Sequence, residues 1–367
     1  MSKGGSQRVV SLLSKYMFRR SSPEIHLIMI EDIIEYTIPQ RVKIKSICNS
    51  TKSPLLHTLF LPIYALRLKR YCKKHNINLI MSFLYRANYL NVLAAIFGSD
   101  HNAVLSERTT ASVTYSGFSF QNILSRFLIY KLYRRAYSII AVSDGVKQDL
   151  YQNFSISLNK IRRIYNPFNI EEIKHKSKEK VKEVWLLKSQ HKVIIGIGRL
   201  IKDKRFDNFL NALQRFHQQN ENIRAIILGD GPQKRKLKKL AKTLKISHLV
   251  KFVGIVDNPF AYLSRADLMV STSVREGFPN AVVEAMICGC PVISTDCKSG
   301  PGEIIVQKQN GILVPKADVE KIVKAVKKIL ADDESREMYI NNAKIRVQVF
   351  ALKNIIPQYE DVIRQVI

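Results

Sequence analysis

The sequence of 367 residues predicts an α/β protein built from two doubly wound domains. Strand-like and helix-like segments alternate from one end of the chain to the other, which is typical of parallel α/β domains. The length exceeds that of one typical domain, and 46% hydrophobic with 24% charged residues is the balance of a folded soluble protein. No repeat of short fixed period interrupts this pattern.

The first half, residues 1–172, contains six segments with the length and composition of strands. They are residues 24–30, 41–47, 77–84, 102–107, 137–143 and 160–166. Helical patterns fill most of the intervals, notably 55–74 and 121–135. The first half is therefore predicted to form one domain of alternating strands and helices.

The second half, residues 173–349, repeats this organisation. Its predicted strands are residues 192–198, 224–230, 250–255, 267–273, 291–296 and 311–315. The interval 171–191 is charged and lacks a clear strand pattern, so it is predicted to be the linker.

The opening MSKGGS is a glycine-rich turn that leads into an amphipathic helix, and no strand precedes it. In a doubly wound domain such a turn follows the first, central strand, whose loss would expose unpaired backbone and core. Either the given start omits one strand of about 5 to 6 residues with its lead-in, or the domain is damaged. We favour the omitted strand.

The net charge of +29, spread over both halves, favours an anionic partner such as membrane lipid, nucleic acid or a phosphorylated substrate. Aromatic residues are not interleaved with the basic runs and no reader motif is present, which argues against nucleic acid. The five cysteines lack metal spacing and indicate reduced cytosolic thiols. No apolar run reaches the roughly 20 residues of a membrane span, and no signal peptide opens the chain, so we expect a cytosolic protein, peripheral on a membrane.

Two carboxylates bracket a strand-to-helix junction in residues 268–296. Glu276 follows an apolar strand, and Pro279 or Asn280 can start a helix that places Glu284 in or near its first turn. Gly289 then ends the helix. Free backbone N–H groups, a positive helix end and two carboxylates suit a ligand with both hydroxyls and phosphates, although a pair of surface glutamates would show the same spacing.

The strand at 192–198 ends at Gly198 and is followed by Arg199 and then Lys204. Glycine allows close approach of backbone to a ligand, and the two cations can neutralise a diphosphate; a solvated charge cluster is the alternative. Gly229 ends the next strand in the same manner within the turn GDG, which by itself is a weak signal.

The motifs GxGRLxxxK, ILGDGP, VKFVGIVDN, ADLMVSTSVREGFPNAVVEAMICGCPVISTD, GPGEII and NGILVP occur in this order over residues 192–367. They closely resemble the second domain of family 4 glycosyltransferases, which have the GT-B fold of two Rossmann-like domains facing a central cleft. The segments GGSQRVVSLLS, AVSDGVKQDL and IYNPF extend the resemblance more loosely to the first half. It implies that a C-terminal helix at about 350–367 returns to the first domain, the acceptor-binding one.

The resemblance implies a role for each matching position. Arg199 and Lys204 would hold the diphosphate of a nucleotide sugar and stabilise the charge on the leaving group. Glu276 and Glu284 match the family's E-x7-E pair, the first near the donor sugar and the second on the ribose. Ile255 and Val256 would lie beside the base. The remaining donor-site positions are Gly198 and Gly229, and Gly277, Phe278, Pro279 and Asn280, which would act through backbone contacts.

In the first domain, Gly4 and Gly5 match the glycine turn that approaches the donor phosphate and acceptor in relatives. Arg108 lies in the loop SERTT, where some relatives place a histidine. If it faces the site, it suggests an anionic acceptor or a different sugar; otherwise it is a solvated loop arginine.

The resemblance implies a retaining enzyme that works without a metal or other cofactor. It would move a hexose or N-acetylhexosamine from a nucleotide-diphosphate sugar, expected to be a UDP-sugar, to a polyprenyl-diphosphate-linked glycan in O-antigen, capsule or related polysaccharide synthesis. A sugar-nucleotide epimerase of the same architecture is the alternative, and a basic nucleic-acid-binding protein is the less favoured one.

Two basic amphipathic segments, 54–74 and 124–137, admit two interpretations. They could dock on anionic lipid at the inner face of the cytoplasmic membrane. Alternatively, their apolar faces pack on the sheet while the basic faces are solvated.

Overall fold

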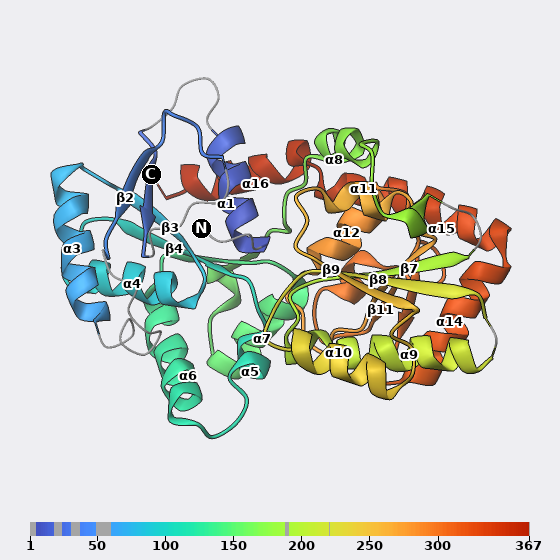
Figure 1. The fold of residues 1–367 in the computed structure, drawn as a ribbon. Coiled ribbons are helices and arrows are strands. Elements are labelled where there is room, and N and C mark those ends of the chain that lie inside the picture. Colours follow the sequence, from blue (N-terminus) through green and yellow to red (C-terminus); the bar gives the residue numbers. More distant parts are fainter. Residues whose placement is uncertain are drawn as a thin grey trace. The chain divides into compact units, whose positions relative to one another are not determined.

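The computed structural model describes residues 5–17, 24–30, 37–48, 60–187, 191–219 and 221–366 of the chain, which folds into two compact units. Unit 1 comprises Met1–Pro167 and Leu352–Ile367, and unit 2 comprises Phe168–Ala351. The sequence placed the corresponding boundaries after residue 172 and at about 350. The predicted α/β class with parallel sheets is confirmed (Figure 1).

Unit 2 is built around one sheet of six parallel strands in the order β12-β11-β10-β7-β8-β9. The strands coincide with the six predicted in the second half of the sequence. They are β7 (Lys192–Ile197), β8 (Ile223–Leu228), β9 (Val250–Gly254), β10 (Leu268–Ser271), β11 (Val292–Thr295) and β12 (Ile312–Val314).

Helices cover both faces of this sheet, with α9 and α10 on one face and α11 and α12 on the other (Figure 1). Phe209, Leu213 and Phe216 show why α9 is a helix here, since their three- and four-residue spacing forms one buried stripe. The helices of the unit are α9 (Phe206–Gln218), α10 (Lys234–Thr243), α11 (Pro259–Leu263), α12 (Asn280–Ile287), α13 (Pro301–Ile304), α14 (Val319–Ala331) and α15 (Asp333–Arg346), with short 3-10 turns η4 (Lys202–Lys204) and η5 (Val347–Phe350).

The prediction that residues 171–191 form the linker is wrong. Helix α8 (Ile170–Ser177) occupies the start of this interval and belongs to unit 2, and the 3-10 turn η3 (Val184–Leu186) follows. The side chain of Asn169 accepts the N–H of Glu172 at the helix start, and Ile170 and Ile173 are buried. The charges dominated the sequence pattern because only these two positions of the short helix are apolar and buried.

Unit 1 contains two separate parallel sheets instead of one. Strands β3 (Leu79–Phe83), β4 (Asn102–Glu107), β5 (Ser138–Ala141) and β6 (Ile161–Arg163) form a sheet in that order, whereas β1 (His26–Met29) pairs only with β2 (Lys43–Ser46). Each of the six strands overlaps a predicted strand. Among the residues that the structure describes, no strand joins β1 to β3.

The helices of unit 1 alternate with these strands. The last helix is formed by the C-terminal end of the chain, which belongs to this unit. Asn102 Nδ2 donates to the carbonyl of Val366 at 3.0 Å and the Tyr137 hydroxyl donates to that of Gln365 at 3.0 Å, which fixes this end of the chain on the four-stranded sheet. The helices are α1 (Gly5–Tyr16), α3 (Leu61–Lys74), α4 (Tyr85–Ile96), α5 (Ala111–Thr114), α6 (Phe120–Leu132), α7 (Asp144–Phe154) and α16 (Leu352–Arg364), with 3-10 turns η1 (Tyr133–Arg135) and η2 (Leu158–Lys160). Within the described ranges, no helix is long and apolar enough to cross a membrane.

A buried polar cluster ties α4 to β3 and β4. Asn91 Nδ2 donates to the carbonyls of Ile80 at 2.9 Å and Val104 at 3.2 Å, which leaves its Oδ1 to accept Nε2–H of His101 at 2.8 Å. The Nδ1 of His101 then accepts the Ser99 hydroxyl at 2.8 Å. Both nitrogens are thus satisfied in the neutral ring, and burial lowers the pKa of His101 to about 4.

The titration of His101 predicts a loss of stability in acid. The unfolded state binds a proton near pH 6.5 and the folded state only near pH 4, so the free energy of unfolding falls as pH drops through this window, by up to about 3 kcal/mol. Urea unfolding of the wild type and of His101→Gln at a series of pH values measures this contribution as the difference between the two profiles. Profiles that stay parallel from pH 6.5 to 4 would contradict the assignment.

Candidate functional site

The predicted site residues of unit 2 gather at the carboxyl edge of its sheet. The central strand β7 has β10 on one side and β8 on the other, so the chain connections reverse direction between β7 and β10. Ligands of open α/β sheets bind at such a reversal, outside the carboxyl ends of the strands. The loop after β7, residues 198–205, and the loop after β10, residues 272–279, flank this point.

Lys204 and Glu276 join these two loops. The ammonium Nζ of Lys204 donates to Oε1 of Glu276 at 2.5 Å, and the two side chains are 24% and 11% exposed. At this partial burial an unpaired carboxylate or ammonium would be costly, so each charge depends on the other. The pair brings together residues that are 72 positions apart in the sequence.

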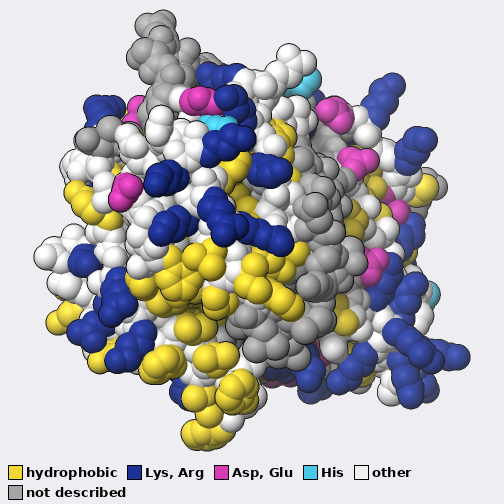
Figure 2. Space-filling view, turned by 90° about the vertical axis from the view of Figure 1, so that its left-hand side faces the viewer, with side chains coloured by type: hydrophobic (Ala, Val, Ile, Leu, Met, Phe, Trp, Pro, Cys, Tyr) yellow, Lys and Arg dark blue, Asp and Glu magenta, His cyan; other side chains and the backbone are white. Residues whose placement is uncertain are grey.

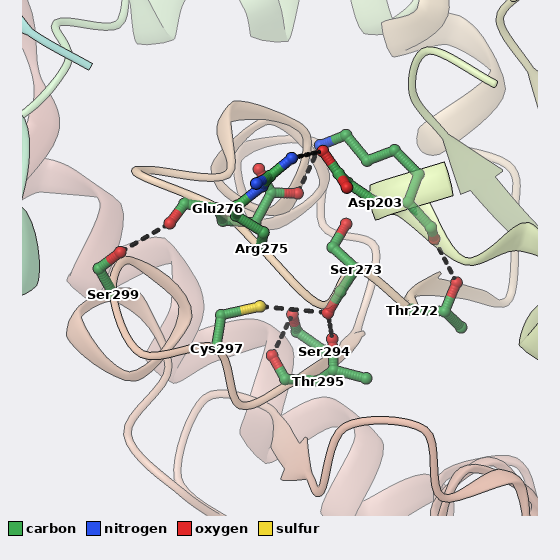
Figure 3. A network of polar contacts seen from close by, with 10 residues as sticks. Asp203, Thr272, Ser273, Arg275, Glu276, Ser294, Thr295, Cys297 and Ser299 are labelled. Carbon is green, nitrogen blue, oxygen red and sulfur yellow. Dashed lines mark hydrogen bonds and ion pairs between the residues drawn. The ribbon is translucent and has the colours of Figure 1, made fainter. Parts of the chain in front are cut away.

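A second set of contacts holds the β7 loop against the β10 loop. The Thr272 hydroxyl lies 2.8 Å from the carbonyl oxygen of Lys204 and 2.9 Å from that of Arg205, and the N–H of Val274 donates to the carbonyl of Asp203 at 2.9 Å. Asp203 also forms an ion pair with Arg275 (Figure 3). These contacts fix the backbone from which Lys204 projects.

Side chains from the β11 edge support the β10 loop from the other side. Ser299 donates its hydroxyl to the carbonyl of Glu276 at 2.6 Å, and the Cys297 thiol donates to the carbonyl of Ser273 at 3.1 Å (Figure 3). Thr295 also donates to the carbonyl of Ser273. Burial, with the nearby Glu276 carboxylate, raises the pKa of Cys297 to about 11, so the thiol remains a protonated donor at neutral pH.

Glycines let the loops after β7 and β8 touch. A Cβ on Gly229, whose φ is +130°, would overlap the carbonyl oxygen of Gly198, and one on Gly231 would lie 2.6 Å from that of Leu200. The Lys234 ammonium Nζ donates a hydrogen bond to Oδ2 of Asp230 at 2.5 Å. This hydrogen bond lowers the pKa of the Asp230 carboxyl group. Its charge is therefore satisfied within its own turn.

Helix α12 begins as the sequence predicts. Asn280 is its first residue, Pro279 precedes it, and Gly289 follows its end with a φ of +75°. Glu284 lies in the second turn and is 8% exposed. Phe278, also 8% exposed, packs its ring 5.3 Å from that of Phe350, so its side chain anchors the loop and only its backbone faces the edge of the sheet.

Arg199, Ile255 and Val256 lie at the ends of β7 and β9. The Arg199 side chain is exposed and makes no ion pair or side-chain hydrogen bond within the described part of the chain. Ile255 is 66% exposed and Val256 half-buried. An unpaired cation and an exposed apolar side chain are therefore both available to a ligand at this edge.

The residues that the sequence assigns to the site in the first domain are Gly4, Gly5 and Arg108. Gly4 lies outside the described residues, and Gly5 is the first residue of α1. Arg108 is 7% exposed, and its guanidinium donates to Asn166 and lies 3.5 Å from the Tyr359 hydroxyl of α16. The description of Arg108 as a solvated loop arginine is thus wrong, because these contacts bury it inside unit 1.

Sequence reasoning missed the residues that hold the loops. Thr272 and Ser299 support the backbone on either side of the Lys204–Glu276 pair, and Asp203 with Arg275 adds a second ion pair beside it. None of them has a spacing that signals its partner, since the partners lie in loops that follow different strands. Within the described residues there is also no group of three or more His, Cys, Asp or Glu side chains arranged to hold a metal ion.

Two family models match the chain. The model described as "Glycosyl transferases group 1" matches residues 177–346, and the model described as "Glycosyltransferase Family 4" matches residues 3–172. Between them they cover most of both units, without residues 347–367.

Named relatives match along nearly the whole chain. The Campylobacter jejuni N-acetylgalactosamine-N,N'-diacetylbacillosaminyl-diphospho-undecaprenol 4-alpha-N-acetylgalactosaminyltransferase is 34% identical over 351 residues, 95% of this chain and 93% of the relative. A second C. jejuni protein, named as a GalNAc-alpha-(1->4)-GalNAc-alpha-(1->3)-diNAcBac-PP-undecaprenol alpha-1,4-N-acetyl-D-galactosaminyltransferase, is 25% identical and covers 100% of this chain and 96% of its own. The structure of Anabaena HepE with UDP-glucose superposes with a TM-score of 0.81 at 20% identity, over 99% and 97% of the two chains.

The contact between the loops after β7 and β8 is testable with two alanine substitutions. Gly229→Ala adds a Cβ that overlaps Gly198, so we expect it to lower the free energy of unfolding of unit 2 by several kcal/mol. Gly254→Ala is the matched control, because Gly254 has a φ of +93° but open space around its Cβ position, and it should cost only about 1–2 kcal/mol. Equal losses in denaturant unfolding would show that backbone strain, and not the contact, constrains Gly229.

Proposed function

Since the chain belongs to family 4 of the glycosyltransferases and has their GT-B fold, we propose that it moves a hexose or N-acetylhexosamine from a UDP-sugar to a lipid-linked glycan in O-antigen, capsule or related polysaccharide synthesis. The observation that carries this proposal is the Lys204–Glu276 pair at the carboxyl edge of the β7–β10 reversal, with the exposed Arg199 on the same loop as Lys204. The two cations, Arg199 and Lys204, and the Glu276 carboxylate suit a ligand in which a diphosphate is attached to a sugar.

The donor would lie across the carboxyl edge of unit 2. Arg199 and Lys204 neutralise the diphosphate, and Glu276 accepts hydrogen bonds from the sugar hydroxyls. Glu284 accepts those of the ribose, and the exposed Ile255 offers an apolar surface to the base. Backbone N–H groups of Gly277, Phe278 and Asn280, held by the buried Phe278 ring, complete the site, and Pro279 contributes none because it lacks an N–H. The UDP-glucose bound to the Anabaena neighbour supports uracil as the base.

Catalysis then depends on electrostatic stabilisation of the leaving group. The bond between the anomeric carbon and the diphosphate oxygen breaks while an acceptor hydroxyl oxygen bonds to the same carbon from the same face, and the hydroxyl proton passes to the departing phosphate oxygen. This course retains the anomeric configuration. Lys204 and Arg199 stabilise the negative charge that grows on the leaving group, which is the work a metal ion would otherwise do.

The negative charge of Glu276 also affects donor binding. A carboxylate beside a diphosphate would repel it, and the direct contact with the Lys204 ammonium offsets this repulsion. The carboxylate can therefore serve the sugar hydroxyls without excluding the anionic part of the donor.

The acceptor is proposed to be a glycan on a polyprenyl diphosphate. The names of both C. jejuni relatives include undecaprenol, and the net charge of +29 suits an anionic lipid-linked substrate. The enzyme would then work at the inner face of the cytoplasmic membrane.

Helix α6 and the turn before it offer a surface for that membrane. An apolar stripe of Phe118, Phe120, Ile123 and Phe127 is exposed, with Phe118 92% and Phe120 79% accessible to solvent. The exposed cations Lys131, Arg134 and Arg135 follow at the end of the helix. Figure 2 shows apolar side chains gathered below a band of Lys and Arg on this face. A surface of this kind suits the headgroup region of an anionic bilayer.

Replacing Lys204 tests the proposed reaction. Lys204→Ala removes a cation from the leaving group, so we expect kcat to fall by roughly 10²- to 10³-fold in transfer assays with UDP-sugars and undecaprenyl-diphosphate glycans. Lys202→Ala is the matched control, since Lys202 is an exposed lysine of the same 3-10 turn and should leave kcat within about twofold. Full activity of Lys204→Ala would overturn the site. Conversion of the donor without any acceptor would instead indicate an epimerase.

The apolar stripe predicts membrane binding. Phe118→Glu together with Phe120→Glu should weaken sedimentation with phosphatidylglycerol vesicles by about tenfold or more, because two exposed aromatic anchors are lost. Ile345→Ser, at a residue that is 72% exposed on α15 of unit 2, is the control and should bind as the wild type does. Unchanged binding of the double variant would reject this surface.

A further inference from the structure

The exposed face of helix α10 in unit 2 is strongly cationic. Residues 231–256 contain eight Lys and Arg and no Asp or Glu. Leu237 and Ala241 are buried in the core of the unit. The exposed cations of the helix and of the turn after it are Arg235, Lys236, Lys238, Lys239, Lys242 and Lys245. None of these six makes an ion pair or a side-chain hydrogen bond with any residue that the structure describes.

This charge pattern destabilises the helix that carries it. Arg235, Lys239 and Lys242 each have like-charged neighbours three and four positions away, which repel them. The first turn contains three cations and no carboxylate, although the N-terminus of a helix favours negative side chains. Helix α14 of the same unit shows the favourable pattern, with Glu320 in its first turn and Lys328 in its last. Helical stability therefore does not explain the cations of α10.

The carboxylates near α10 already have partners. Asp230 accepts a hydrogen bond from Lys234 within its own turn. Glu183, which lines a surface groove together with Lys238, accepts the Lys251 ammonium at 2.5 Å. Helix α9 packs beside α10 on the same face of the sheet (Figure 1), and its single carboxylate, that of Asp207, is paired with an arginine. The six cations of α10 thus keep their charge available to an anionic partner outside the chain.

The composition of this face indicates the kind of partner. Five of the six cations are lysines, whose compact ammonium groups on flexible stems suit many phosphates in varied positions better than one phosphate in a fixed geometry. Residues 232–249 contain no Phe, Tyr or Trp, so no base-stacking platform for nucleic acid accompanies the cations. A layer of lipid phosphates therefore fits this face better than a nucleic acid does.

We propose that the six exposed cations form an α10 cationic face, which binds the headgroup layer of an anionic bilayer. Clusters of four to eight Lys and Arg on one amphipathic helix bind anionic lipid in this way, and each cation contributes about fivefold in affinity. The stripe on α6 offers the exposed rings of Phe118 and Phe120, whereas α10, which the structure describes throughout, exposes no large apolar side chain. Binding by the α10 cationic face is therefore electrostatic and sensitive to salt.

Sedimentation with phosphatidylglycerol vesicles tests this proposal without donor or acceptor, so the result does not depend on the proposed transferase activity. Arg235→Gln, Lys239→Gln and Lys242→Gln together should raise the lipid concentration for half-maximal binding by about 100-fold at low salt. The difference from the wild type should vanish in about 1 M salt, where the Debye length is about 3 Å. The denaturant midpoint should not fall, because glutamine favours helices nearly as well as lysine and the repulsion is relieved.

The matched control is a second triple variant, Lys321→Gln, Lys324→Gln and Lys328→Gln, which removes the same net charge from exposed positions of α14. It should change vesicle binding by less than about threefold, because charges farther than a Debye length from the bilayer contribute little. Arg235→Lys keeps the charge of the α10 cationic face and should bind as the wild type does.

Three results would overturn the proposal. Unchanged vesicle binding of the α10 triple variant would show that the face makes no contact with the bilayer. Equal weakening by both triple variants would show that only the net charge of the chain attracts vesicles. A loss of binding to a DNA oligonucleotide, with vesicle binding retained, would assign the face to nucleic acid. If the α10 triple variant does not fold, Lys239→Gln and Lys242→Gln decide the matter singly, at about fivefold each.

Discussion

The carboxyl edge of the sheet in unit 2, where we propose that the donor binds, depends on one contact, the ion pair between Lys204 and Glu276. It connects the loops that leave β7 and β10, the two strands between which the connections reverse, and it does so with both side chains mostly shielded from water. The neighbouring contacts hold the two residues of this ion pair in place. Thr272 holds the backbone of Lys204, and Ser299 holds that of Glu276. A change in either loop would separate charges that are costly to leave alone.

Much of this site could be predicted from the sequence, because its parts follow apolar strands and parallel strands bring their carboxyl ends to one edge. The start of α12 at Asn280 and its end before Gly289 also follow from local chemistry. The direct pairing of Lys204 with Glu276 could not be predicted from residue spacing. It depends on β10 lying beside β7, and strand order is set by packing over the whole sheet.

The failures have a common cause in tertiary burial. A solvated side chain was one of two alternatives for the loop residue Arg108, yet α16 places Tyr359 beside its guanidinium, which is buried. The charged segment after residue 170 looks like a linker, yet two buried isoleucines make it a helix of unit 2. In both cases the deciding partner lies far away in sequence or contributes only a few apolar positions, so a local pattern cannot show it.

The two units differ in how completely the strands at the centre of their sheets are paired. In unit 2 the central strand β7 is paired on both sides, and the loops at its carboxyl end are held rigidly enough for a glycine contact such as Gly229 with Gly198. In unit 1 the strands β1 and β3 line a cavity of about 750 Å³, and within the described residues no strand pairing joins its two sheets. Among the described residues β1 and β3 are therefore each paired on one side, whereas β7 is paired on both.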